Sequence, residues 1–316
     1  LLNVALVNSF GFMFFNSTLT TASYSAWLVH MESTNPLSNE AFHGGSSLYD
    51  ASASTARASL VTRGWTITDG GPAPTYYSAE YLLLAETVTL PFTLNGHTTD
   101  WGDGTVNALD THTYASGGTY TITSTGADVT DLLYDGHALA PKLLRVLDGS
   151  AINMTNMFHV FEGCTSLTTV ALFDISGIAS LGYMFRYCSS LTSVPLFDTS
   201  SVTLMFYMFY GCTSLTTVPL FDTSSVTNMY GTFNGCSSLT TVPLLDVALV
   251  NNFDSMFSGV TLSTASYSAF LVHLESTNAL SNEAFHGGNS LYDSSATTAR
   301  ASLVTRGWTI TDGGLA

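Results

Sequence analysis

Apolar residues recur with a period of 24 positions through the second half of the chain. Four cysteines mark the period, and each carries the same neighbours: Cys164, Cys188, Cys212 and Cys236. A phenylalanine lies three places before each cysteine, a leucine three places after it and a valine six places after it. A short fixed period in one chemical pattern is typical of a solenoid, in which every repeat, here called a rung, packs on its neighbours.

The pattern also predicts which side chains of a rung point inward. In the third rung the apolar positions ten, seven, four and three places before the cysteine are Val202, Met205, Met208 and Phe209. After the cysteine, the segment LTTVPLFD predicts a short strand whose inward residues are Leu215, Val218 and Leu220.

A helical turn is predicted to follow that strand, with its exposed amides capped by an aspartate or by the serine after it. The aspartates recur in register, ten places after each cysteine: Asp174, Asp198, Asp222 and Asp246. A fifth rung ends at Val260 without a cysteine.

A longer period encloses the short one. Residues 1–71 match residues 244–314 at a constant offset of 243, and 57 of those 71 positions are identical. We therefore expect tandem modules, with residues 1–16 forming the last rung of a preceding stack. We interpret the apolar opening as a repeat of 244–258 rather than as a signal peptide, because it lacks a basic flank and a small-residue cleavage site.

The remaining segments change their periodicity. Residues 17–71 and 261–316 each predict a small α/β cap with two helices, and 72–78 reads as a linker. Residues 79–128 alternate as strands do, and residues 129–260 carry the rungs. The predicted fold class is mainly β with short helices, in modules of β-sandwich, solenoid and cap.

Two stretches resemble known families. The turn DWGDGT followed by HTYASGGTYTI is similar to the PKD-type immunoglobulin-like β-sandwich. The unit GCTSLTTVPLFDTSSVTNMYGTF resembles the repeat of BspA-like leucine-rich-repeat surface proteins, which occur on bacterial surfaces, in some protists and in phage tails. This resemblance implies adhesion to proteins or cells, without shared catalytic residues. The small number of rungs departs from the family and implies a small binding face.

Composition excludes several classes of function. The net charge is −16 with one lysine and six arginines, so the chain is unsuited to nucleic acids or an anionic membrane surface. No apolar stretch is long enough for a membrane-spanning helix. No nucleophile, metal-protease or phosphate-loop motif occurs, so we predict no enzyme and no cofactor. The weakly charged, Ser/Thr-rich modules are typical of proteins exposed outside a cell or on a virus particle.

Some acidic and thiol groups have two interpretations. Asp100 and Asp103 could ligate calcium, but a turn in which they bond local amides is favoured, because no dense acidic set surrounds them. The four cysteines are predicted to be free and buried, since equivalent side chains on adjacent rungs point in parallel and cannot converge into disulfides.

The positions where the rungs differ are the best candidates for binding. Those six, five and two places before the cysteine fall between the inward residues and should point outward, although they carry large aromatics. Tyr, Phe and Arg are typical interface anchors. We therefore predict a partner-binding patch, referred to below as the outer patch: Tyr183, Arg186, Phe206, Tyr207, Tyr210 and Tyr230. The alternative is that flanking loops or the sandwich cover these side chains.

The sequence thus favours a non-enzymatic, surface-exposed extracellular protein with a structural or adhesive role, binding proteins or cells through the rungs. The alternative is a subunit of a phage tail fibre or of a self-assembling filament, in which the same face contacts another copy.

Overall fold

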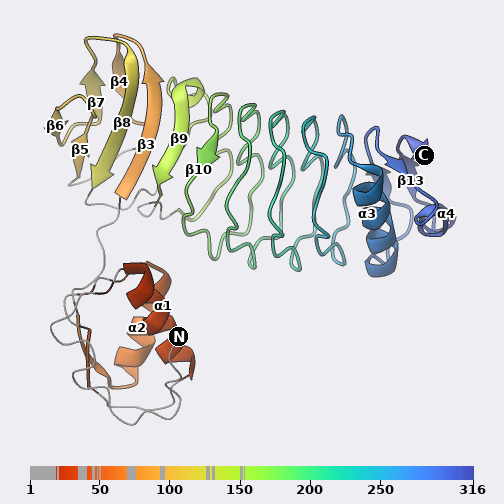
Figure 1. Ribbon diagram of the computed structural model, residues 1–316, viewed down its shortest axis with the longest axis horizontal. Helices are drawn as coiled ribbons and strands as arrows, with labels where there is room; N and C mark the ends of the chain where they lie inside the picture. The colour runs from red at the N-terminus through yellow and green to blue at the C-terminus, as the bar shows by residue number, and fades with distance from the viewer. Residues whose placement is uncertain are drawn as a thin grey trace. The chain divides into compact units, whose positions relative to one another are not determined.

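The computed structural model describes residues 21–34, 41–44, 51–69, 76–92, 97–125, 132–149 and 154–316, with single positions 19, 47, 49, 129 and 152. The predicted rung at 1–16 lies outside the described residues. The chain divides into two compact units, Leu1–Thr75 and Tyr76–Ala316 (Figure 1). This division falls within the predicted linker.

The first unit contains two helices and a parallel strand pair. Helix α1 spans Thr21–Thr34 and α2 spans Ala51–Thr62, while β1 (Ala41–His43) pairs with β2 (Thr66–Thr68). The two helices were expected from the sequence. The core is aromatic: Trp27 stacks on Phe42 with ring centroids 4.4 Å apart.

The second unit begins with two sheets in which most strand pairs are antiparallel. The larger has six strands in the order β10-β9-β3-β8-β5-β6. Their bounds are β3 Tyr76–Leu83, β5 Thr98–Asp100, β6 Val106–Asn107, β8 Gly118–Thr125, β9 Leu143–Asp148 and β10 Thr169–Val170. The smaller pairs β4 (Thr87–Thr89) with β7 (Thr111–Thr113). Strand β9 belongs to the segment predicted as rungs, yet it pairs with β3, so one sheet runs from the predicted sandwich into the first rung.

Three tyrosine hydroxyls meet in the core where this sheet joins the rungs. Tyr77 and Tyr81 project from β3, and Tyr134 lies just before the 3-10 turn Ala140–Lys142. The Tyr77 and Tyr134 oxygens are 2.5 Å apart, and Tyr81 also bonds to Tyr134. All three are fully buried, and burial raises the pKa of Tyr81 to about 12. Each phenol hydroxyl in the cluster therefore has a hydrogen-bond partner inside the protein.

Successive rungs are joined by backbone hydrogen bonds in constant register. The amide of Phe185 donates to the carbonyl of Met208 at 3.0 Å, and that of Phe209 donates to Thr232 at 2.9 Å. The core rings follow the same register, with the Phe185 ring stacked on that of Phe209 at 5.7 Å. Figure 1 shows these turns of chain side by side between β10 and the C-terminal helices.

Val202, Met205, Met208 and Phe209, which lie before the cysteine and were predicted to point inward, are buried. The prediction that Leu220 points inward is wrong. Leu220 is 61% exposed, whereas the next residue, Phe221, is 3% exposed and fills the core. Equivalent leucines in the other rungs are exposed too, and we refer to the four as the leucine row: Leu172, Leu196, Leu220 and Leu244.

The predicted strand after each cysteine is also largely wrong. Among the described rungs, only the first forms one, β10, and the Ala171 amide that follows it donates to Val146 at 2.8 Å. At the position of Ala171 the later rungs carry Pro195, Pro219 and Pro243. Proline has no amide hydrogen, so the ladder cannot continue there.

The aspartates after each strand segment cap a turn. The Oδ1 atom of Asp222 accepts from the amide of Ser224 at 3.0 Å, and Asp198 accepts from Ser200 in the same way. This bonding lowers the pKa of Asp222, the Ser224 hydroxyl being the main cause. The capping role is confirmed, although the segment forms a turn rather than a helix.

The four cysteines are free and buried, as predicted. Three of their thiols also donate to a backbone carbonyl of the preceding rung. The Cys212 sulfur lies 3.0 Å from the carbonyl oxygen of Phe185, and Cys236 makes the same contact with Phe209 at 3.1 Å. Burial raises the pKa of the Cys236 thiol to about 12. The cysteine therefore fills the core and gives a buried carbonyl a second donor, since Phe185 also accepts from the Cys188 amide at 3.1 Å.

An α/β segment covers the fifth rung. It consists of α3 (Thr264–Thr277), β11 (Ala284–His286), β12 (Leu291–Tyr292), α4 (Thr297–Thr305), β13 (Thr309–Thr311) and β14 (Gly314–Leu315). Phe253 forms a parallel bridge with Phe285, and the Phe257 amide donates to the His286 carbonyl at 3.0 Å. The cap thus continues the hydrogen bonding of the rungs and buries their terminal apolar side chains. The described residues are mainly β with four helices, as predicted.

Candidate binding surface

The six residues of the outer patch are all half-buried, and they lie on successive rungs. Their rings contact one another. Tyr183 stacks on Tyr207 with centroids 5.3 Å apart, and Phe206 meets Tyr183 edge-on at the same distance. Tyr207 also meets Tyr210 and Tyr230 edge-on, at 5.2 and 4.9 Å. The structure therefore brings the predicted residues together, and their partial burial comes in large part from each other.

An unusual backbone conformation holds this surface. The residue five places before the cysteine has a positive φ in each rung: 63° at His159, 59° at Tyr183, 55° at Tyr207 and 59° at Gly231. Each makes a tight turn in which its carbonyl accepts from the amide three residues later, as Tyr207 does from Tyr210 at 3.2 Å. Glycine fits this conformation freely, but a bulky side chain is strained in it.

Two glycines make room for the rings. A Cβ at Gly231 would lie 2.6 Å from the Cε1 atom of Tyr207, and a Cβ at Gly182 would lie 2.7 Å from the Phe206 ring. Real side chains do not approach this closely. The sequence differences between rungs are therefore complementary, since a small residue on one rung accommodates a large ring on an adjacent rung.

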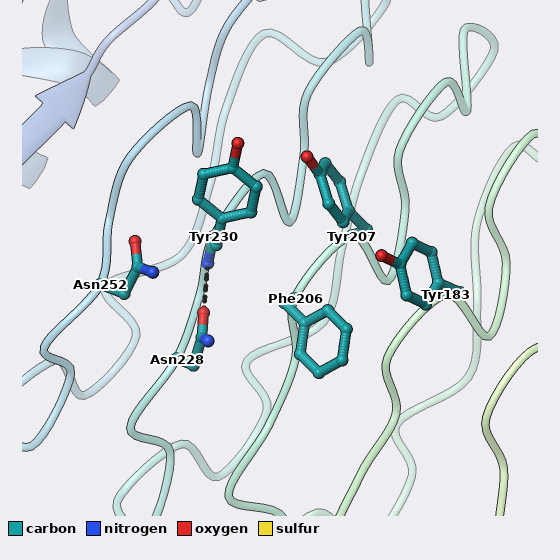
Figure 2. A pocket seen from close by; sticks show the side chains of 6 residues that line it. All are labelled: Tyr183, Phe206, Tyr207, Asn228, Tyr230 and Asn252. Carbon is teal, nitrogen blue, oxygen red and sulfur yellow. Dashed lines mark hydrogen bonds between the residues drawn. The ribbon is translucent and has the colours of Figure 1, made fainter.

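A cavity of about 310 Å³ lies among these side chains. Figure 2 shows the rings of Tyr183, Tyr207 and Tyr230 grouped around Phe206, with Asn228 and Asn252 at one side. Sequence reasoning missed both asparagines. They lie eight places before the rung's cysteine position, where the first rung has Asn156. The recurrence of asparagine at this place in the 24-residue period could have identified both residues from the sequence.

The guanidinium of Arg186 links the patch to the first rung. Its Cζ lies 4.6 Å from the ring centroid of Tyr187 and 5.1 Å from that of Tyr183. Its Nη1 donates to Glu162 Oε1 at 2.9 Å. Tyr187 is 43% exposed and has a positive φ of 61°, and sequence reasoning did not include it in the patch. A cation packed against aromatic faces and paired with a carboxylate is held rigidly in place.

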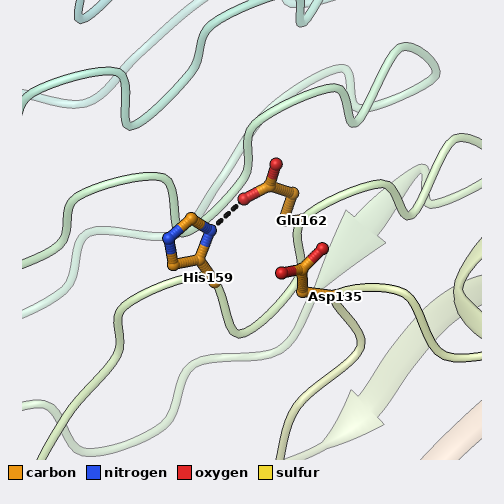
Figure 3. Close-up of side chains that lie close together, drawn as sticks. All are labelled: Asp135, His159 and Glu162. Atoms are coloured by element: carbon orange, nitrogen blue, oxygen red, sulfur yellow. Dashed lines mark hydrogen bonds and ion pairs between the residues drawn. The ribbon is translucent and has the colours of Figure 1, made fainter.

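A cluster with metal-ligand chemistry lies beside Arg186. Side-chain ligand atoms of Asp135, His159 and Glu162 all lie within 4.8 Å of one another (Figure 3). Imidazole and carboxylate groups bind Zn²⁺ and similar ions. However, one oxygen of Glu162 already bonds to His159 Nδ1 and the other accepts from Arg186. Both oxygens of Glu162 and the Nδ1 atom of His159 are therefore engaged with partners in the protein.

Calcium binding by Asp100 and Asp103 was the alternative interpretation of the turn that follows β5. There Asp100 Oδ1 accepts from the Gly102 amide at 2.9 Å, and Asp103 Oδ1 accepts from the Thr105 amide at 3.0 Å. The second Asp103 oxygen bonds to His112 at 2.7 Å, and this bond is the main cause of a lowered Asp103 pKa. The favoured interpretation, in which both aspartates bond local amides, agrees with these contacts.

One protein-family model matches part of the chain, and that family has no assigned activity. The family described as "Mycoplasma protein of unknown function, DUF285" matches residues 152–270, which include most of the residues predicted to carry the rungs. Comparison with curated proteins and with solved structures gave no match. Among the described residues, the helices are all too short or too polar to cross a membrane.

Proposed function

We propose that the chain is a non-enzymatic, surface-exposed extracellular protein with a structural and adhesive role, which binds proteins or cells through the outer patch. In this proposal residues 129–260 form a leucine-rich-repeat solenoid of the BspA-like type, and residues 79–128 a PKD-like sandwich. The tandem modules would add their individually weak contacts into strong attachment.

The observation that carries the proposal is the strained placement of large rings. Tyr183 and Tyr207 occupy a left-handed position that Gly231 fills without strain in the next rung. Bulky residues in this conformation cost on the order of 1 kcal/mol each, and such strain concentrates at binding sites. Core packing does not require these rings, because the inward positions of the same rungs are filled by other residues.

The register of the backbone supports the solenoid part of the proposal. Amides in one rung donate to carbonyls 23 residues later, as from Phe161 to Met184 at 2.9 Å and from Phe185 to Met208 at 3.0 Å. Equivalent side chains consequently form rows along the stack, and a row of aromatic side chains presents an extended contact surface.

A second candidate function is copy-to-copy contact in a fibre or filament. The leucine row favours it, because four exposed leucines in register form an apolar stripe on the rungs. Such a stripe suits association with another copy of the same protein.

The two functions are separated by binding and imaging experiments on the whole chain. We expect the double variant Tyr207→Ser/Tyr210→Ser to lose attachment to immobilised matrix proteins and cells while its melting temperature stays close to that of the wild type. The matched control is Leu196→Ser/Leu220→Ser, on the leucine row of the second and third rungs. Regular polymers in negative stain that only the leucine variant abolishes would favour the filament, and unchanged attachment of the tyrosine variant would refute adhesion through the patch.

A further inference from the structure

We propose that the cavity among Tyr183, Phe206, Tyr207, Asn228, Tyr230 and Asn252 binds a neutral saccharide. This inference rests on the proposed adhesive function and specifies the chemical class of the ligand. Three properties of the cavity support it: its lack of charge, its oriented amide donors and its aromatic surface.

The lining carries no formal charge at neutral pH, because it consists of three tyrosines, one phenylalanine and two asparagines. The chain as a whole has a net charge of −16. An anionic ligand would be repelled by the molecule, and a cationic one would offer no acceptor to the two asparagine amide groups of the lining. The cavity therefore suits an uncharged ligand.

Both amide groups are held in a fixed orientation. Asn228 Oδ1 accepts from the backbone amide of Tyr230 at 2.9 Å, and Asn252 Oδ1 accepts from that of Asp254 at 3.2 Å. Since each oxygen is engaged, each Nδ2 group remains as a pair of donors with no bond to other side chains or backbone of the described residues. Two pre-oriented amides can donate to the hydroxyl and ring oxygens of a sugar.

The aromatic part of the cavity complements the rest of a sugar ring. A pyranose carries C–H groups on its faces and hydroxyls around its rim. Phe206 and the neighbouring tyrosines offer aromatic surface to the C–H groups, while the amides lie at one side for the rim (Figure 2). A volume of about 310 Å³ is at the lower end for ligand sites, which suits one or two sugar rings.

These rings are preorganised for binding. Gly182 and Gly231 leave space for Phe206 and Tyr207, and the Tyr207 ring is packed between those of Tyr183 and Tyr230. A site that is ordered before the ligand arrives loses less entropy on binding. Proline-rich peptides also bind aromatic surfaces, and they form a separate arm of the test below.

The test uses the whole chain on an array of neutral glycans, sialylated glycans and proline-rich peptides, with saturation-transfer NMR on any neutral sugar that binds. Asn228→Asp and Asn252→Asp keep the oxygen that accepts the backbone bond but remove the two donors and add a charge. Asn156→Asp is the matched control, because Asn156 accepts from the Phe158 amide at 2.9 Å in the same register but does not line the cavity.

We expect neutral glycans to bind, a loss of at least about tenfold in each cavity variant, and wild-type binding in the Asn156 control. Selective binding of sialylated glycans or of proline-rich peptides would overturn the inference, as would equal binding by all three variants. If no glycan binds while the whole chain still attaches to matrix proteins through the outer patch, the saccharide inference fails and the adhesive function stands. Loss of both would remove the proposed function as well.

Discussion

The ring of Tyr207 occupies the space that a side chain at Gly231 would need. A Cβ built on Gly231 would lie 2.6 Å from Tyr207 Cε1, although the two residues are 24 positions apart and occupy the same place in adjacent rungs. The rungs therefore vary in a coordinated way, and Gly231 is part of the surface that Tyr207 presents.

This relationship predicts the effect of filling the space. Gly231→Ala should destabilise the protein by about 2–4 kcal/mol, because the new methyl group meets the ring and the residue must keep a φ of 59°. Gly163→Ala is the control, since Gly163 also has a positive φ but has no atom within 4 Å of the added Cβ. It should cost about 1 kcal/mol. Urea unfolding measures both, and equal losses would contradict the contact.

A second prediction concerns the strain at Tyr207 itself. Tyr207→Gly and Tyr207→Ala lose the same ring contacts, but only alanine retains the strain of the left-handed conformation. We expect the glycine variant to be more stable than the alanine variant by about 1 kcal/mol. Chemical denaturation of the two variants gives the difference directly. A more stable alanine variant would mean that residue 207 does not hold a positive φ.

The buried thiols predict a third result. Cys212→Ala should cost about 1–3 kcal/mol, because it creates a small cavity and removes one of the two donors to the Phe185 carbonyl, the other being the Cys188 amide. Cys212→Ser keeps a donor at that place and should lose less. The raised pKa of the thiols also predicts that Ellman's reagent reacts with all four cysteines only on unfolding. Rapid reaction of the folded protein would contradict their burial.

A fourth prediction concerns alkaline pH. The folded-state pKa of Tyr81 is raised by burial from 10.0 to about 12, and those of Tyr77 and Tyr134 are raised in the same direction. The unfolded tyrosines ionise first, so stability is fully present below pH 10 and falls as pH rises toward 12.

Urea unfolding at pH 7 to 11.5 measures this loss. Tyr134→Phe removes one hydroxyl of the cluster, so it should be less stable at pH 7 by about 1–3 kcal/mol and should lose less stability between pH 10 and 11.5. Tyr120→Phe, a change at a partly exposed hydroxyl that bonds to Ser116, serves as the control. A flat profile for the wild type would contradict the burial of the cluster.

The sequence predicted much of the rung because its inward positions repeat with one period. Val202, Met205, Met208 and Phe209 are buried as expected, and the outer patch is assembled from residues chosen by their position between them. Periodicity reports which face is apolar. It does not report where a backbone donor is missing.

The errors lie where local chemistry overrides that period. Pro219 removes an amide that a strand would need, and the chain turns so that Phe221 rather than Leu220 enters the core. Asn228 was missed because its polar side chain lies outside the apolar pattern, although asparagine recurs at the same place in other rungs. The pairing of β3 with β9 joins segments more than 60 residues apart, and no local pattern specifies it.

Partners are proposed to contact the outer patch, and hydroxyl-radical footprinting of the whole chain on its bound surface tests this contact most directly. Binding should protect Tyr183, Phe206, Tyr207 and Tyr230 from oxidation and leave the leucine row unchanged. Protection confined to Leu172, Leu196, Leu220 and Leu244, with the patch oxidised at its unbound rate, would contradict the account.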